Sequence, residues 1–133
     1  AEDPQNDFLP SFGKITRYLA PGGPGVRTDG AIYTGYEIPP YYDSMCAKLI
    51  VWALTWDALI DRATRALRDI GVYGVKTTIP YHLEILRNAE FQAGKFNTGF
   101  VEAHPELANY SVKRSTRDVA AAVAAALAVN MGL

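Results

Sequence analysis

The first half of the chain, residues 1–56, carries short β-type patterns separated by glycine and proline. Apolar positions alternate with polar ones, or run together, over four segments that we predict to be strands: residues 14–19, 26–28, 31–36 and 47–54. Asp29-Gly30 separates the second segment from the third and predicts a hairpin turn. The almost continuous apolar run of the last segment predicts a buried strand. Strands this close together favour an antiparallel sheet or a small barrel-like sandwich.

The second half of the chain has the apolar spacing of helices. Apolar positions from Leu59 to Ile70 recur every three or four residues, with Thr55 as the predicted N-cap and Gly71 as the predicted end. A second helix is predicted after Thr78, and the alanine-rich end of the chain predicts a last helix that buries little area. The predicted fold class is therefore α+β, with an antiparallel-sheet or barrel-sandwich-like N-terminal half packed with helices in the C-terminal half.

Composition narrows the class of protein. With 133 residues, of which 49% are hydrophobic and 20% charged, the chain has the composition of one soluble globular domain. The formal net charge of −1 and the lack of a basic run argue against nucleic acid or a membrane as a partner. A single cysteine, Cys46, excludes an internal disulfide and favours a cytoplasmic location. The abrupt opening on Ala1-Glu2-Asp3-Pro4 leads us to expect part of a larger protein.

Residue types that carry out catalysis are sparse. His82 and His104 are far apart and have no cysteine or paired carboxylate at the spacing of metal ligands. Cys46 lies in an apolar segment typical of a small buried side chain, and Ser44 lacks the Gly-x-Ser-x-Gly setting of a nucleophile. Gly22-Gly23-Pro24-Gly25 lacks the lysine and hydroxyl residue of a phosphate-binding loop. We therefore expect no catalytic residue and no metal site in this chain.

Three local features favour contacts with other groups. Tyr41-Tyr42-Asp43-Ser44, on a loop stiffened by two prolines, offers either an adaptable polar surface or a turn packed on its own core. Arg27 can bind a carboxylate, within the chain or across an interface, or remain solvated. Phe96-Asn97-Thr98-Gly99-Phe100 places two aromatic residues around small polar groups, which suits the edge of a flat ligand or the start of a helix.

In their order along the chain, these segments resemble the biotin carboxylase C-terminal domain. The matching motifs are Ala1-Glu2-Asp3-Pro4, Phe8-Leu9-Pro10-Ser11, Gly13-Lys14-Ile15, Ala20-Pro21-Gly22-Gly23, Gly25-Val26-Arg27, Pro39-Pro40-Tyr41-Tyr42-Asp43-Ser44-Met45, Lys48-Leu49, Gly74-Val75-Lys76-Thr77 and Asn97-Thr98. The resemblance predicts one domain over residues 1–102. Residues 103–133 resemble the extension of the biotin carboxylase subunit of two-subunit pyruvate carboxylases, and we expect a helical C-terminal extension there.

The resemblance implies that the parent protein is a biotin-dependent ligase. Such an enzyme uses ATP to activate bicarbonate as carboxyphosphate and places the carboxyl group on N1 of biotin, with Mg²⁺ or Mn²⁺ as the metal cofactor. Its catalytic groups would lie in an ATP-grasp domain before Ala1, so this chain alone is expected to be inactive. The expected partners are that ATP-grasp domain, a carboxyltransferase subunit, a biotin carrier domain and, in a homodimer, a second copy of the chain.

The resemblance also assigns positions within this chain. Thr98, with Asn97 beside it, matches the position that packs against the adenine of ATP, where the family often has an aliphatic residue. Arg27 and Asp43 match positions at the dimer interface of the acetyl-CoA carboxylase branch. The neighbouring pair Tyr41-Tyr42 is expected on the same interface.

Other interpretations stay open. The parent protein can be the biotin carboxylase subunit of acetyl-CoA carboxylase or of another acyl-CoA carboxylase. Pro24 stands where the acetyl-CoA carboxylase branch can have a bulky aromatic residue, which argues against an identical dimer. An interpretation of a different class is an autonomous protein-interaction domain without catalysis, which would bind through Tyr41, Tyr42 and the alanine-rich helix. A small hydrolase is disfavoured because no nucleophile–base pair is evident.

Overall fold

The computed structural model describes residues 1–111, and the predicted alanine-rich helix lies outside the described residues. The strands are β1 (Glu2–Asp3), β2 (Leu9–Pro10), β3 (Gly13–Lys14), β4 (Arg17–Leu19), β5 (Val26–Gly30), β6 (Glu37–Ile38), β7 (Ala47–Val51) and β8 (Gly71–Tyr73). The helices are α1 (Trp56–Asp69), α2 (Ile79–Arg87), α3 (Ala89–Gln92) and α4 (Phe100–Ala103), with 3-10 helices η1 (Pro4–Asn6) and η2 (Pro105–Ala108). Within residues 1–111, no helix has the length and apolar character needed to cross a membrane.

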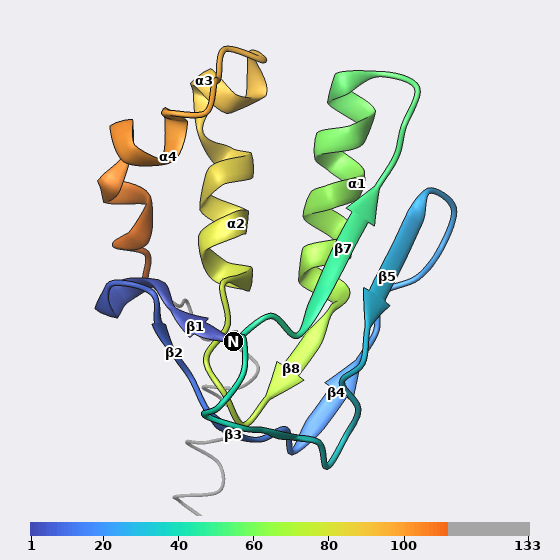
Figure 1. Ribbon diagram of the computed structural model, residues 1–133. Helices are drawn as coiled ribbons and strands as arrows, with labels where there is room; N and C mark the ends of the chain where they lie inside the picture. Colours follow the sequence, from blue (N-terminus) through green and yellow to red (C-terminus); the bar gives the residue numbers. More distant parts are fainter. Residues whose placement is uncertain (112–133) are drawn as a thin grey trace, which may run out of the picture.

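The strands pair antiparallel in four ladders, β1–β2, β3–β6, β4–β8 and β5–β7. Over the described residues these ladders do not close into a barrel. Helices α1 and α2 lie side by side, α1 also contacts β7, and α2 contacts α3 and η2 (Figure 1). The predicted α+β class is confirmed, and the sheet is divided into short ribbons.

The hairpin predicted at Asp29-Gly30 is wrong. Strand β5 runs through both residues and pairs with β7, so that Asp29 lies opposite Lys48 and Gly30 lies opposite Ala47. Residues 31–36 form turns and irregular backbone instead of a strand. A Cβ at Gly30 would come within 2.6 Å of the Ala47 Cβ. Glycine therefore allows close approach of two strands here and does not form a turn.

The first predicted strand is split into β3 and β4, and the split lies at Ile15. The nitrogen of Ile15 donates to the oxygen of Tyr36 across 2.8 Å, and its oxygen accepts from Gly35 across 2.7 Å. The next nitrogen, that of Thr16, donates instead to the oxygen of Tyr73 across 2.8 Å. The side chain of Ile15 is fully buried. The alternation in sequence thus indicated extended backbone but not the change of partner.

Strand β7 is shorter and more exposed than the buried strand predicted over residues 47–54. Leu49 and Val51 are half-buried, whereas Ile50 is 37% exposed on the opposite face. The core lies between the helices and consists of Ile60, Ala63 and Leu86, with Val51, Trp56, Leu67 and Phe91 packed against it. The β5–β7 ladder therefore covers the helices with one face only, which is the usual arrangement of an antiparallel ribbon.

Both main helices begin as predicted. The Oγ1 atom of Thr55 accepts from the nitrogen of Ala58 across 3.3 Å and caps α1. The helix ends at Asp69, just before Gly71 starts β8. Pro80 lies in the first turn of α2, where its missing N–H leaves no helical hydrogen bond unmade. Local capping and apolar spacing were sufficient to place these two elements.

Candidate functional site

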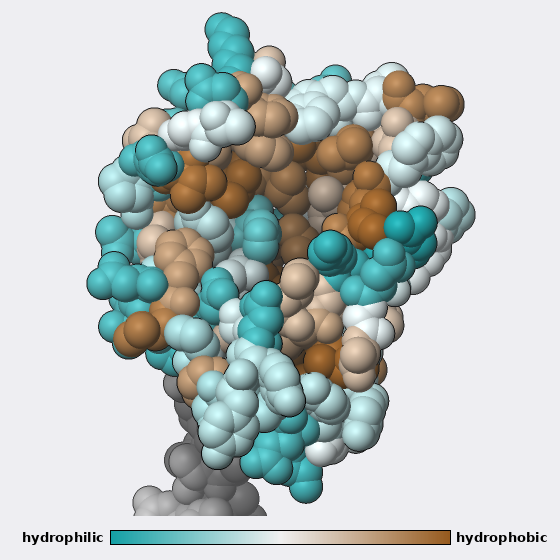
Figure 2. All heavy atoms as spheres, viewed as in Figure 1, coloured by the Kyte–Doolittle hydropathy of each residue, from teal (hydrophilic) through white to brown (hydrophobic). Residues whose placement is uncertain are grey.

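Two adjoining hollows lie where α1, α2 and β7 meet, and together they form what we call the interhelical groove. The larger has a volume of about 480 Å³ and apolar walls that include Leu67, Ile85 and Phe91. The smaller, of about 230 Å³, shares Ile70 and Ile79 with the larger. Figure 2 shows apolar residues gathered in this depression between the helices. The groove is thus an apolar surface suited to binding another apolar surface.

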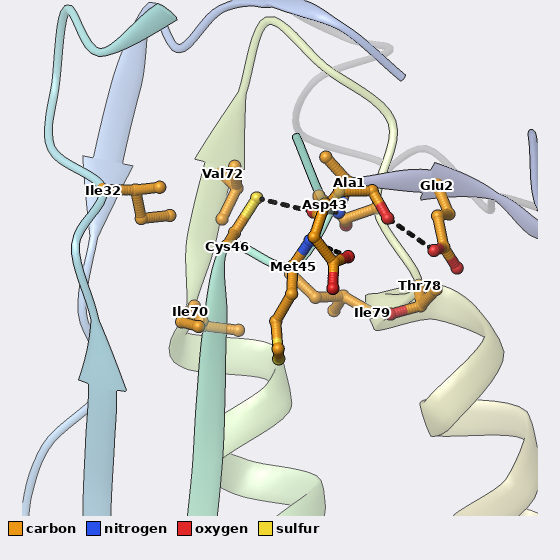
Figure 3. Close-up of a pocket in the computed structure, with 13 residues that line it drawn as sticks. Ala1, Glu2, Ile32, Asp43, Met45, Cys46, Ile70, Val72, Thr78 and Ile79 are labelled. Atoms are coloured by element: carbon orange, nitrogen blue, oxygen red, sulfur yellow. Dashed lines mark hydrogen bonds between the residues drawn. The ribbon is translucent and has the colours of Figure 1, made fainter. Parts of the chain in front are cut away.

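The first residues of the chain form one wall of the smaller hollow (Figure 3). The backbone nitrogen of Ala1 donates to the oxygen of Ser44 across 2.8 Å, and the Ser44 hydroxyl donates to Oε1 of Glu2 across 2.6 Å. Ser44 is buried. Its hydroxyl is therefore used to join two distant segments, which is a structural role rather than that of a nucleophile.

Asp43 borders the smaller hollow, and the two tyrosines before it extend into solvent. The Oδ1 atom of Asp43 accepts from the nitrogen of Met45 across 3.1 Å, which fixes the carboxylate on its own loop. Tyr41 is 86% exposed and Tyr42 is 80% exposed. The loop therefore does not pack its tyrosines on the core of this domain, and both rings are available for contact with another molecule.

Arg27 lies on the outer face of the β5–β7 ladder. Its side chain is 70% exposed and forms an ion pair with Asp29 at 3.0 Å. Lys48 and Ile50 share this face, opposite Asp29 and Arg27 respectively. An exposed ion pair of this kind contributes at most about 1 kcal/mol. Over the described residues, no hydrogen bond or ion pair joins Arg27 to Asp43.

Asn97 and Thr98 lie in an exposed turn between α3 and α4. The Oδ1 atom of Asn97 accepts from the nitrogen of Gly99 across 2.8 Å, and its backbone oxygen accepts from Phe100 across 3.1 Å. Asn97 therefore starts the short helical turn that the sequence predicted. Neither of these two residues lines the groove, although Phe91, which does, stacks on Phe96 beside the turn.

Four rings from separate elements support this turn and form an aromatic cluster: Trp56, Phe91, Phe96 and Phe100. Phe91 and Phe96 stack with their centroids 4.5 Å apart, and Trp56 lies 5.5 Å from Phe96. Phe96 is still 45% exposed. The sequence marked Phe96 and Phe100 but not the other two rings, because the helical spacing of Trp56 and Phe91 indicates only a core position.

The two histidines have different surroundings. Desolvation in the groove lowers the pKa of His82, although much of this residue is open to solvent. His104 lies between the carboxylates of Glu90 and Glu106, an arrangement that the sequence did not reveal because Glu90 lies on a separate element, α3. Among residues 1–111, no three histidine, cysteine or carboxylate side chains are placed to hold a metal ion.

These observations describe an α+β domain with surfaces for binding. The biotin carboxylase C-terminal domain family matches residues 1–103. The chain therefore belongs to that family, which confirms the resemblance seen in its motifs.

Comparison with individual relatives shows how much of their length the chain matches. Over 133 residues, its full length, it is 47% identical to the 2-oxoglutarate carboxylase small subunit of Hydrogenobacter thermophilus and covers 28% of it. Over 104 residues, 78% of the chain, it is 52% identical to a pyruvate carboxylase subunit of Methanothermobacter thermautotrophicus and covers 21% of it.

A solved structure agrees with the family match. It is a dimer of the biotin carboxylase domain of the Hydrogenobacter thermophilus 2-oxoglutarate carboxylase, in complex with MgADP, ADP and bicarbonate. It superposes with a TM-score of 0.80 at 50% identity over 84% of this chain and 24% of that structure. The chain thus spans about a quarter of the length of the proteins it matches.

Proposed function

We propose that the chain is the C-terminal domain of an ATP-dependent biotin carboxylase, a ligase that carries out the first half-reaction of a pyruvate carboxylase. In that reaction ATP and bicarbonate give ADP and carboxyphosphate, and the carboxyl group passes to N1 of carrier-bound biotin as phosphate is released. The observation that carries the proposal is the family match over residues 1–103. The complex of a relative with MgADP and bicarbonate supports ATP and Mg²⁺, or Mn²⁺ in its place, as cofactors beside biotin.

Within this enzyme the domain would bind and position rather than break bonds. Residues 1–111 bring together no metal-binding group, so the metal would be held by another part of the protein. The exposed turn at Asn97 and Thr98 would border the adenine of ATP, with Phe96 as an apolar neighbour. Small polar side chains beside an aromatic ring suit the edge of a planar base.

The partners follow from the exposed surfaces. Ile15 is the one large side chain of residues 1–111 that is fully buried, which is a small core for a domain of this length. We therefore assign the interhelical groove to contact with the ATP-grasp domain of the same polypeptide. Arg27, Asp43, Tyr41 and Tyr42 would lie at a homodimer interface. A biotin carrier domain and a carboxyltransferase subunit would complete the enzyme, which we place in the cytoplasm.

The extent of one alignment favours an acid other than pyruvate as the final acceptor of the carboxyl group. The match to the 2-oxoglutarate carboxylase small subunit runs through all 133 residues, whereas the match to the pyruvate carboxylase of Methanothermobacter thermautotrophicus spans 104. The C-terminal extension therefore agrees with a carboxylase of 2-oxo acids, and 2-oxoglutarate is the alternative to pyruvate. Incorporation of labelled bicarbonate into each acid, with the carboxyltransferase present, distinguishes the two.

The experiment that tests the proposal compares the full-length protein with the 133-residue chain at equal concentration. We expect the full-length protein to hydrolyse ATP only with bicarbonate and to do so faster with added biotin. The 133-residue chain should show no such hydrolysis. Bicarbonate-dependent ATP cleavage by the short chain, or its absence from the full-length protein, would overturn the proposal.

A further inference from the structure

His104 packs against the aromatic cluster behind the exposed turn at Asn97 and Thr98. Its ring lies 4.5 Å from that of Phe100, centroid to centroid, and Phe100 in turn lies 5.6 Å from Phe91. Only 18% of the His104 side chain is exposed. His104 thus packs behind the Asn97-Thr98 turn and supports it, but its ring does not lie on the exposed face of that turn.

Both ring nitrogens of His104 face carboxylate oxygens. Nδ1 lies 2.9 Å from Oε1 of Glu106, and Nε2 lies 3.3 Å from Oε2 of Glu90. An ionised carboxylate only accepts hydrogen bonds, and a neutral imidazole has a single N–H. Both contacts can therefore be hydrogen bonds only when the ring is an imidazolium. Loss of one proton would leave a nitrogen lone pair facing a negative oxygen.

The two carboxylates lie on either side of the turn in sequence. Glu90 is on α3 and Glu106 is on η2, whereas Asn97 and Thr98 lie between them. A protonated His104 therefore joins the element before the turn to the element after it, and we call these three residues the Glu90–His104–Glu106 clasp. With the clasp closed, the backbone between α3 and η2 has its two ends held together.

The groups that face His104 all favour its charged form or are uncharged. The hydrogen bond to Glu106 is the main cause that raises the pKa of His104; burial of the ring lowers it in part, and the hydrogen bond to Glu90 raises it further. From α4 the neighbour is the ring of Phe100. On α2, burial and then the charge of Glu106 raise the pKa of the Tyr81 phenol, so this neighbour of Glu106 brings no charge to the clasp.

We propose that His104 is a positioning residue, whose protonated ring closes the Glu90–His104–Glu106 clasp and so holds the Asn97-Thr98 turn in the arrangement that receives the adenine of ATP. This inference rests on the proposed function, because it takes the turn to border the nucleotide. His104 acts on ATP through the turn and touches none of the reacting atoms. Its loss should therefore alter the Michaelis constant for ATP and leave kcat nearly unchanged.

The sign of the pH effect follows from the raised pKa. In the folded protein His104 keeps its proton to a higher pH than the ordinary value of 6.5. The clasp is complete below that ordinary value and is lost as the pH rises through the folded-state pKa. The Michaelis constant for ATP should therefore rise with pH over this interval, by about three- to tenfold for the loss of one charge-assisted hydrogen bond.

The test uses the full-length enzyme and measures the Michaelis constant for ATP from pH 6 to pH 9. His104→Gln is uncharged and carries both of its N–H donors on one nitrogen, so it cannot replace the two separate ring donors and should give a raised, flat profile. His104→Arg keeps a permanent charge and a planar donor group, and should give a low, flat profile. Glu37→Gln removes an exposed carboxylate on β6, outside the groove and the clasp, and should follow the wild type. A His104→Gln profile that rises with pH as the wild type does would overturn the proposal.

A second readout separates this inference from the proposed function. Hydrogen exchange of the peptide over residues 96–104, in wild type and His104→Gln at matched pH, reports the closure of the clasp without nucleotide. We expect faster exchange in the variant at low pH and equal exchange at high pH. If exchange differs in this way but the Michaelis constant does not, the clasp stands and the adenine assignment fails. Equal exchange at every pH would overturn the clasp itself.

Discussion

The indole nitrogen of Trp56 donates a hydrogen bond to the backbone oxygen of Gln92 across 2.8 Å and ties the first turn of α1 to the last turn of α3. The same ring packs beside Phe91 and Phe96 of the aromatic cluster. One side chain thus joins the short helix α3 to the long helix α1 by both a hydrogen bond and ring packing. A four-residue helix has little stability of its own, so this contact has a measurable effect.

Replacing Trp56 with phenylalanine should destabilise this end of the domain. The change keeps an aromatic ring but removes the donor, leaves the Gln92 oxygen without that partner and reduces the buried area. We expect a loss of about 1–3 kcal/mol, seen as faster hydrogen exchange over residues 89–94 of the full-length protein. The matched control is Trp52→Phe, because Trp52 is 63% exposed and the change should cost less than about 0.5 kcal/mol. Equal effects of the two substitutions would contradict the assigned role.

Replacing Gly74 with alanine should destabilise the fold beside Ile15, where the β3–β6 ladder ends and the β4–β8 ladder begins. Gly74 has a φ of 101°, and a Cβ there would collide with the carbonyl oxygen of Lys14 and lie 3.0 Å from the nitrogen of Thr16. We expect destabilisation of about 2 kcal/mol or more, measured by the thermal unfolding of the full-length protein. Gly22→Ala is the control, since nothing lies within 4 Å of a Cβ at Gly22. A Gly74→Ala protein as stable as this control would show that the backbone can relax.

Replacing Asp43 with alanine should weaken self-association of the full-length protein more than it slows chemistry. The carboxylate lies on the loop that exposes Tyr41 and Tyr42, where a partner chain can meet all three side chains. Removing a charged group from such an interface should raise the dimer dissociation constant about tenfold or more. Sedimentation equilibrium measures the change, and Asp61→Ala on the exposed side of α1 is the control. An unchanged dimer in Asp43→Ala would remove this loop from the interface.

Replacing Thr98 with arginine should raise the Michaelis constant for ATP by about tenfold or more, because a long charged side chain would occupy the space of a planar base. The turn is exposed, so the substitution has room in the free enzyme and should not disturb folding. Thr98→Ser keeps the hydroxyl and should behave as the wild type. Steady-state kinetics with varied ATP provides the measurement. Identical kinetics in wild type and Thr98→Arg would rule out the adenine assignment.

The helical half of the fold was predictable because its signals are local. The cap at Thr55, the apolar spacing after it and the proline in the first turn of α2 each act within one or two helical turns. Strand pairing was harder to predict from the sequence, because most strands pair with a distant part of the chain. Asp29-Gly30 has the composition of a turn, but β7 offers this segment a full ladder of hydrogen bonds from a distant part of the chain. Tertiary pairing therefore overrode the local preference.

The candidate site was predictable only where a motif marked it. Thr98 and Asp43 came from the family resemblance, and the structure shows both beside exposed surfaces, which leaves their roles as predictions. The resemblance marked His104 and Glu106 only as part of the C-terminal extension and gave them no role. The contact of His104 with Glu106 is local, but that with Glu90 on α3 depends on how α3 and η2 meet, which no regular spacing in sequence encodes.

Ile15 has a consequence for how this domain can change over evolution. Its backbone belongs to one ribbon and that of the next residue, Thr16, belongs to another, so inserting or deleting a residue here would shift two registers at once. A one-residue shift turns every side chain of a strand to the wrong face. Homologous sequences should therefore keep a constant length from Gly13 to Leu19. Gaps should collect at residues 31–34 of the connection between β5 and β6, ahead of Gly35 and Tyr36, whose backbones bond to Ile15.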